Sequence, residues 1–299
     1  MVVSCIQRFA GAILLACVFH CARARANEHM KVILLGTGTP FLSAERFGTA
    51  ILVEADGQKL LFDCGRGAVL RLAEAGIKPS AVDFLFLTHL HSDHVVGIPD
   101  LWLTGWFLGR QGALEIKGPT GTRDLVTHLK QAFSADVAGR KAPPEYLPAS
   151  GAEINGENIH QGVEYDRSGL RVTAFLVDHL NIKPALGYRV DYQGHSVVIS
   201  GDTRFSENLV HFATATDCLM HVAWLAGSRD STPQSMRSLA SAEDAGRVFA
   251  AVKPKLAVVY HYKDEQGIVE AVRSEYRGPL VIARDLMVID IGEKANVEP

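Results

Sequence analysis

The sequence predicts an α/β protein of the αββα type, in which two mixed β-sheets pack face to face and helices cover both outer sides. Short apolar segments of strand length alternate with segments of helical spacing, in two successive series. The chain has 299 residues, of which 47% are apolar and 21% charged, enough for a large core. No internal linker separates two halves, so one domain is expected over residues 27–299.

The first series carries clear turn and stop signals. Asp56-Gly57 lies between two apolar segments and predicts a β-hairpin. Gly76 follows a segment of helical spacing, as is typical of a helix C-terminus. The predicted strands of this series span 32–35, 50–54, 59–62, 84–87 and 114–117, and the helices 68–75 and 123–133.

The second series follows a segment, 136–162, that is rich in Pro, Gly, Ala and polar residues and is expected to be a long surface excursion. Ser241 and Asp244 have the spacing of a capping box at the start of a helix. The predicted strands span 170–176, 185–191, 196–199, 219–223 and 256–260, with a closing strand in 280–291, and the helices 241–251 and 268–276.

Residues 1–26 have the pattern of a cleaved secretory signal. Arg8 precedes an apolar run over 9–19, and Ala24-Arg25-Ala26 offers small residues at a signal-peptidase spacing. The run is too short to span a bilayer, which needs roughly 20 residues. A periplasmic or secreted protein is therefore expected. Met30 followed by a strand is the alternative, a cytoplasmic start.

Removing this leader would also remove Arg8, Arg23 and Arg25, leaving 27 basic against 33 acidic residues and a net charge of −6. Such a domain lacks the bulk attraction on which non-specific nucleic-acid binding depends. Only Cys64 and Cys218 would remain, too few for a disulfide scaffold. Whether these two pair or stay as thiols is open, as is the oligomeric state, with a homodimer as one option.

The segment that carries chemistry directly follows the apolar strand 84–87. It places four metal-binding side chains in six residues: His89, His91, Asp93 and His94. Imidazole and carboxylate are ligands that zinc takes readily, and a pair of metal ions needs about this many donors. Four such donors at this spacing predict a catalytic metal site rather than a polar loop of structural histidines.

This segment resembles the His-x-His-x-Asp-His signature of the metallo-β-lactamase superfamily, and the resemblance extends from Lys31 to about Gly292. Other segments resemble the same superfamily and its ribonuclease Z, arylsulfatase and phosphodiesterase branch. They are Asp63-Cys64-Gly65, Val177-Asp178-His179, Ser200-Gly201-Asp202-Thr203, and His261 after the strand 256–260.

The resemblance implies seven ligands for two divalent metal ions, with zinc expected and manganese or iron as alternatives. His89, His91 and His179 would hold the first ion, Asp93, His94 and His261 the second, and Asp202 would bridge them. Asp63 would support the ligand loop without binding metal. Each of the last three ligands in the chain follows an apolar strand, where loops gather at one edge of a sheet.

Two further groups of residues have open roles. His221 resembles the histidine that protonates the leaving group in ribonuclease Z, but Val222 replaces the glutamate that follows it there; the alternative is a core histidine. Trp102, Trp106 and Phe107 are expected to pack in a helix, with a wall of the substrate pocket as the alternative. The other histidines after residue 26 are expected to be structural.

The resemblance implies a hydrolase in which a metal-activated hydroxide attacks the substrate, Asp93 orients it and His221 protonates the leaving oxygen. Asp202 lies only 23 positions after His179, so the arm that holds tRNA in some ribonuclease Z enzymes is absent from this interval. A small phosphodiester or aryl sulfate ester is therefore the expected substrate. The alternatives are tRNA 3′-end cleavage, hydrolysis of a lactone or carboxyl ester, and a non-catalytic metal-binding module. A β-lactamase is disfavoured, since Cys218 does not fit the metal-binding cysteine of those enzymes.

Overall fold

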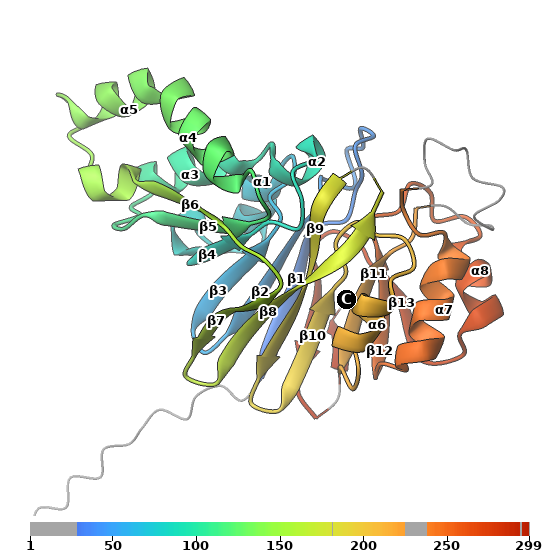
Figure 1. The fold of residues 1–299 in the computed structure, drawn as a ribbon. Helices are drawn as coiled ribbons and strands as arrows, with labels where there is room; N and C mark the ends of the chain where they lie inside the picture. Colours follow the sequence, from blue (N-terminus) through green and yellow to red (C-terminus); the bar gives the residue numbers. More distant parts are fainter. Residues whose placement is uncertain (1–28, 181, 225–237, 294, 299) are drawn as a thin grey trace, which may run out of the picture.

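Two β-sheets face each other, and helices cover the outer side of each sheet (Figure 1). This computed structural model describes residues 29–180, 182–224, 238–293 and 295–298. The arrangement confirms the predicted αββα sandwich. The proposed signal sequence, residues 1–26, lies outside the described residues, so export stays a prediction. Within the described part of the chain, no helix is long and apolar enough to cross a bilayer.

The first sheet has eight strands and contains both the first and the last strand of the described residues. Its strands β3 to β6 run parallel to one another, whereas the other neighbouring pairs are antiparallel. In spatial order the strands are β15 (Ala295–Glu298), β14 (Met287–Ile291), β1 (Met30–Gly36), β2 (Ala50–Ala55), β3 (Gln58–Phe62), β4 (Phe84–Phe86), β5 (Leu114–Gly118) and β6 (Ile154–Asn158).

The second sheet has seven strands. Its strands β10 to β13 are parallel, and β7 to β10 form an antiparallel meander. In spatial order the strands are β13 (Leu280–Ile282), β12 (Leu256–Tyr260), β11 (Cys218–Val222), β10 (His195–Ile199), β9 (Ile182–Tyr192), β8 (Leu170–His179) and β7 (Gly162–Arg167).

Helices of the first half cover the first sheet, and helices of the second half cover the second (Figure 1). The α-helices are α1 (Ala68–Glu74), α2 (Ser92–Val95), α3 (Ile98–Phe107), α4 (Thr122–Ala132), α5 (Ser134–Lys141), α6 (Glu207–Phe212), α7 (Ala242–Val252) and α8 (Ile268–Glu275), and the 3-10 helices are η1 (Pro79–Ala81) and η2 (Ala149–Ala152).

Three apolar layers hold the sandwich together. The central layer lies between the sheets and includes Phe62, Phe86 and Tyr188, whose rings contact one another. The two outer layers lie between each sheet and its helices, with Trp102 in one and Phe249 in the other. Burial of these side chains is the main favourable term in folding, and it fixes the edges of both sheets relative to each other.

Several local predictions are confirmed. Asp56 and Gly57 have φ angles of 51° and 73°, which suit the tight turn between β2 and β3. The capping box of α7 is present, because Ser241 accepts from the amide of Asp244 and Asp244 accepts from the amide of Ser241. Cys64 and Cys218, whose pairing the sequence left open, are both buried and unpaired.

Two predictions were partly wrong. The expected surface excursion at 136–162 contains most of α5, all of η2 and the edge strand β6, in which only Ile154 is buried. Alternation of apolar residues was therefore too weak to reveal the strand, which forms by pairing with β5. The expected closing strand is two strands in different sheets, because the chain crosses from β13 to β14 through residues 283–286.

Candidate metal centre

The metal-binding side chains gather where strands of both sheets end. His89 follows β4, His179 ends β8, Asp202 follows β10 and His261 follows β12. Carboxyl ends of parallel strands lie at one edge of a sheet, so these loops converge as the sequence predicted. The structure brings all seven predicted ligands together at this edge, in two groups.

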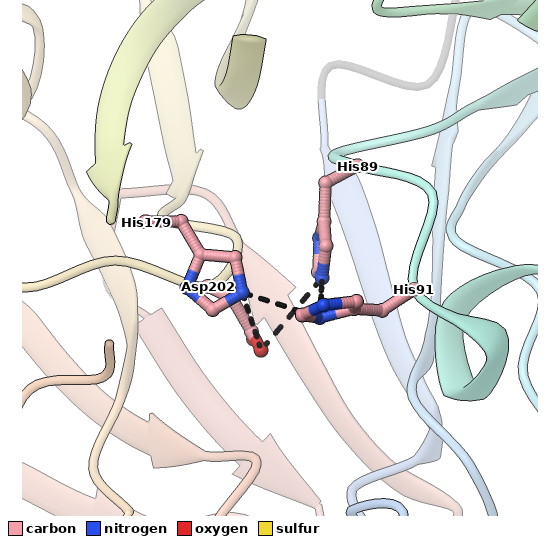
Figure 2. A group of neighbouring side chains, drawn as sticks. All are labelled: His89, His91, His179 and Asp202. Atoms are coloured by element: carbon pink, nitrogen blue, oxygen red, sulfur yellow. Dashed lines mark hydrogen bonds and ion pairs between the residues drawn. The ribbon is translucent and has the colours of Figure 1, made fainter. Parts of the chain in front are cut away.

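The first group comprises His89, His91, His179 and Asp202, whose ligand atoms lie within 4.8 Å of one another (Figure 2). Nδ1 of His91 lies 3.0 Å from Nε2 of His89 and 3.2 Å from Nε2 of His179. The three imidazoles thus point to a common volume from two separate loops, as a cation-binding site requires.

The second group comprises Asp93, His94 and His261, and all three are buried. Oδ2 of Asp93 lies 3.6 Å from Nε2 of His94 and 3.7 Å from Nε2 of His261. Asp93 and His94 lie within the short helix α2, which directs both side chains inward beside His261.

Asp202 connects the two groups. Its Oδ2 atom lies 3.9 Å from Nε2 of His89 and 4.0 Å from Nε2 of His179, which belong to the first group. The same oxygen lies 3.6 Å from Nε2 of His94 and 3.3 Å from Nε2 of His261, in the second group. One carboxylate oxygen central to four imidazoles is the arrangement of a bridging ligand.

Unpartnered polar atoms support a cation at this position. Among the described residues, Oδ2 of Asp93, Oδ1 of Asp202 and the Nε2 atoms of His94 and His261 are buried without a hydrogen-bond partner. A buried polar atom without a partner destabilises the folded state, so a bound cation that pairs with these atoms would be stabilising. Histidine nitrogens with carboxylate oxygens are a donor set that zinc and similar divalent metal ions accept.

Hydrogen bonds behind the ligands fix which imidazole nitrogen is available. Nδ1 of His94 lies 2.8 Å from Oδ2 of Asp63. Nδ1 of His179 is 3.0 Å from the carbonyl oxygen of Ser238, and Nδ1 of His261 is 2.7 Å from that of Gly38. A carboxylate or carbonyl accepts only from a protonated nitrogen, so Nε2 of each ring is left free to bind metal.

Asp63 supports the ligand loop as the sequence predicted. Its carboxylate accepts from the amide and the hydroxyl of Thr88, each at 2.8 Å, in addition to its contact with His94. Thr88 Oγ1 also lies 3.0 Å from Nδ1 of His89. One buried carboxylate therefore orients ligands of both groups.

Charges within the cluster also favour a bound cation. Burial lowers the pKa of His89 well below its usual range, and nearby His94 adds to this effect, so His89 stays neutral. For His94, burial is outweighed by the carboxylates of Asp202 and Asp63, which raise its pKa well above the usual value. The carboxylates that attract a proton to His94 would equally attract a metal ion to its Nε2 atom.

His221 does not join the cluster. Its ring is fully buried, 6.0 Å from that of Phe249 in α7, and its Nδ1–H donates to the carbonyl of Val222 at 2.6 Å. Leu219 of β11 and Ala223, which follows the strand, pack in the outer layer with Phe249. Burial lowers the pKa of His221 to about 4. This placement favours the core-histidine alternative, and the general-acid role stays a prediction.

The aromatic residues of α3 serve mainly in packing, as expected. Trp102 and Trp106 are buried, and their indole N–H groups donate to the carbonyls of Ala152 and Pro148. Phe107 is exposed beneath the guanidinium of Arg140. The expected histidine ligands were visible in the sequence, but the supporting carbonyls of Gly38 and Ser238 were not, because backbone acceptors leave no sequence signal.

The sequence is similar to that of characterised protein families over most of its length. A family described as "Anti-Pycsar protein Apyc1" matches residues 30–277. Ribonuclease Z of Mycobacterium sp. (strain KMS) is 39% identical over 196 residues, covering 65% of this chain and 68% of the relative. Ribonuclease Z of Mycolicibacterium paratuberculosis (strain ATCC BAA-968 / K-10) is 33% identical over 277 residues, covering 88% and 98%.

A solved structure supports the same fold. The metallo-β-lactamase fold protein YhfI from Bacillus subtilis superposes with a TM-score of 0.71 at 18% identity, covering 88% of this chain and 99% of that one. The family match, the relatives and the two groups of metal-binding side chains all indicate the same class of protein. The chain is a metal-dependent hydrolase of the metallo-β-lactamase fold and belongs to the family described as Anti-Pycsar protein Apyc1, with ribonuclease Z enzymes among its relatives.

Proposed function

We propose that this protein hydrolyses small phosphodiesters at a centre of two divalent metal ions, with zinc as the expected metal. The observation that carries the proposal is the position of Asp202 Oδ2 between four imidazoles, at 3.3–4.0 Å from each Nε2 atom. A shared carboxylate holds two ions close together, and such pairs suit in-line displacement at phosphorus. The relatives named ribonuclease Z favour a phosphodiester over a sulfate ester, because RNA cleavage breaks a phosphodiester bond.

Each of the seven side chains would have a defined role in binding metal or in catalysis. His89, His91 and His179 would hold one ion, Asp93, His94 and His261 the other, and Asp202 both. When bound, such ions lower the pKa of a coordinated water to near 7 and neutralise charge that develops on the phosphate. Asp93 would orient the attacking oxygen and accept its proton, since its Oδ2 atom has no hydrogen-bond partner among the described residues.

A second candidate is tRNA 3′-end cleavage, which the ribonuclease Z relatives favour. The two candidates share the bond broken and differ in the size of the substrate. Between His179 and Asp202 the described residues form all of the strands β9 and β10, which leaves no room in sequence for a long tRNA-holding arm. This favours the small substrate.

A panel of substrates tests both candidates. Purified protein with quantified metal would be assayed on bis-p-nitrophenyl phosphate, p-nitrophenyl sulfate, a lactone and a precursor tRNA, with Asp93→Ala as the control. We expect about two metal ions per chain and turnover of the phosphodiester that the variant loses. Activity on the sulfate or lactone alone would replace the proposed substrate class, and activity on precursor tRNA alone would establish the second candidate.

A further inference from the structure

Two ligands of the first group, His179 and Asp202, come from strands that are not neighbours in their sheet. His179 ends β8 and Asp202 follows β10, and β9 lies between these two strands. Oδ2 of Asp202 nevertheless lies 4.0 Å from Nε2 of His179 (Figure 2). Because no ladder of hydrogen bonds joins β8 to β10, contacts outside the ladder must set the separation of these two ligands.

Asp178, the residue before His179, supplies such contacts. Its carbonyl accepts from the amide of Arg204 at 2.8 Å, and its amide donates to Oγ1 of Thr203 at 3.2 Å. Its carboxylate also accepts from Nη2 of Arg204. Thr203 and Arg204 directly follow Asp202. Three polar contacts therefore join the residue before one ligand to the two residues after the other.

The carboxylate of Asp178 also restrains the turn that follows His179. Its Oδ1 atom accepts from the amide of Leu180 at 3.2 Å, while its Oδ2 atom faces Arg204. Leu180 has a φ of 48°, a left-handed conformation that is uncommon for residues other than glycine. One side chain therefore restrains the backbone on both sides of the ligand.

A third segment contacts both ligand loops. The carbonyl of Thr203 accepts from the amide of Ala240 at 2.7 Å, and both residues are fully buried. The carbonyl of Ser238, two residues earlier, accepts from Nδ1 of His179 at 3.0 Å. The loops that carry His179 and Asp202 are therefore held against a common segment as well as against each other.

The ion pair of Asp178 and Arg204 lies at the outer side of this arrangement. The Asp178 side chain is 40% exposed and the Arg204 side chain is 24% exposed. Ion pairs that solvent reaches contribute little to the stability of a fold. The main effect of this pair should therefore be local, on the position of the adjacent metal ligand.

We propose that Arg204 is a positioning residue, which acts through Asp178 to hold His179 at the separation from Asp202 that the first metal ion requires. The inference rests on the proposed centre of two metal ions and not on its substrate. The second group should be little affected, because Asp93 and His94 lie in α2 and His261 follows β12.

Charge and position predict opposite effects of replacing Arg204. A guanidinium near a cation site repels the metal ion, so removal of its charge alone would raise metal affinity. Removal of a positioning contact would lower the affinity, by about 10-fold if Arg204 resembles other residues that orient metal ligands. Arg204→Met removes both the charge and the contact with Asp178, so the sign of the change identifies the role.

The test measures the affinity for each ion in the full chain, by competition between zinc and a chelator. His91→Ala and His261→Ala identify the binding step of each group. We expect Arg204→Met to weaken the first-group step by about 10-fold and the second-group step by less than about 2-fold. The visible absorption of cobalt bound at the first group should shift. Asp178→Asn should weaken the same step, and the double variant should bind no more weakly than Asp178→Asn alone.

Arg171→Met is the matched control. Arg171 forms an exposed ion pair with Asp166 across β7 and β8, at 2.7 Å, and this variant should keep both affinities. An unchanged or higher first-group affinity in Arg204→Met, or an equal loss in Arg171→Met, would overturn the inference. So would weakening of both steps together with a lower Tm of the metal-free protein. If Arg204→Met does not fold, Arg204→Gln removes the same charge, and the same outcomes apply.

Failure of the proposed function would look different. A wild-type chain that bound fewer than two ions would contradict the proposed centre, and this inference with it. A wild-type chain that bound two ions but hydrolysed no phosphodiester would contradict the proposed function alone. The zinc affinities of Arg204→Met would then still decide the role of Arg204.

Discussion

The carboxylate of Asp202 lies 3.3 Å from Nε2 of His261, so a residue of the first ligand group contacts the second. The two residues come from adjacent regions of one sheet, after β10 and β12, with β11 between those strands. Burial opposes the charge on Asp202, but His261 and His94 outweigh it and hold its pKa well below the usual range. The carboxylate is therefore ionised and ready to hold cations.

Replacing Asp202 by Asn should disrupt both halves of the centre. We expect fewer than two metal ions per chain and a fall in phosphodiester kcat/KM of at least about 100-fold, since even residues that merely support a metal ligand contribute 10- to 100-fold. Elemental analysis after gel filtration and the bis-p-nitrophenyl phosphate assay would measure these changes. Asp290→Asn, at an exposed contact with His29, should change neither. Two ions retained in the Asp202 variant would refute the bridging role.

Asp63→Asn tests the support behind the ligands. The variant keeps the shape of the side chain but cannot accept equally from Thr88 and His94, so zinc affinity should fall by about 10- to 100-fold. Chelator competition would measure the affinity. Asp63 has a φ of 59°, which Asn tolerates, and Asp56→Asn at a φ of 51° is the matched control for that backbone conformation. Unchanged affinity in the Asp63 variant would show that Thr88 and His94 are oriented by other contacts.

Removing metal should destabilise the fold. The buried atoms of Asp93, His94 and His261 that lack partners would remain uncompensated. A metal present at 100 times its Kd stabilises the native state by about 2.7 kcal/mol, so chelation should lower Tm by several degrees and added zinc should restore it. Scanning calorimetry would show this. In Asp93→Ala the chelator should have a smaller effect, and an equal effect would indicate that the metal binds elsewhere.

Much of the fold follows from local sequence, and the exceptions have physical reasons. The strands β1, β10 and β12 are short apolar runs and could be predicted. The edge strand β6 buries only Ile154, so its pairing with β5, not its own pattern, makes it a strand. The crossing between β13 and β14 depends on which sheet each strand joins, and neighbouring strands, not the segment itself, decide that.

The convergence of the seven proposed ligands could be predicted because their side chains carry metal-binding groups and follow apolar strands. The contact of Asp202 with both groups and the carbonyl acceptors behind His179 and His261 could not be predicted. Each depends on chain segments far apart in sequence.

His221 offers a test that separates catalysis from folding. If it protonated the leaving group, His221→Gln would cost about 100- to 10,000-fold in rate. Because the ring packs against Phe249 and bonds to Val222, we expect a loss of less than about 10-fold on a dinucleoside monophosphate, whose alkoxide leaving group needs a proton, far smaller than that of Asp93→Ala. A loss comparable to that of Asp93→Ala would instead support the general-acid role.

The same variant should change how stability depends on pH. The pKa of His221 is about 4 in the folded protein and about 6.5 in an unfolded chain, so the unfolded state binds more protons between these values. The contribution of neutral His221 to the free energy of unfolding is therefore complete above about pH 6.5. It declines as the pH falls toward 4, by about 1 kcal/mol at pH 5.5. Glutamine does not titrate, so between pH 7.5 and 5.5 the free energy of unfolding should fall by about 1 kcal/mol less in His221→Gln than in the wild type. Urea unfolding of both proteins at equal metal loading would measure this difference. The metal ligands titrate in both proteins, and their contribution cancels in this difference. Parallel pH profiles would mean that His221 is accessible to protons in the native state, as a general acid must be.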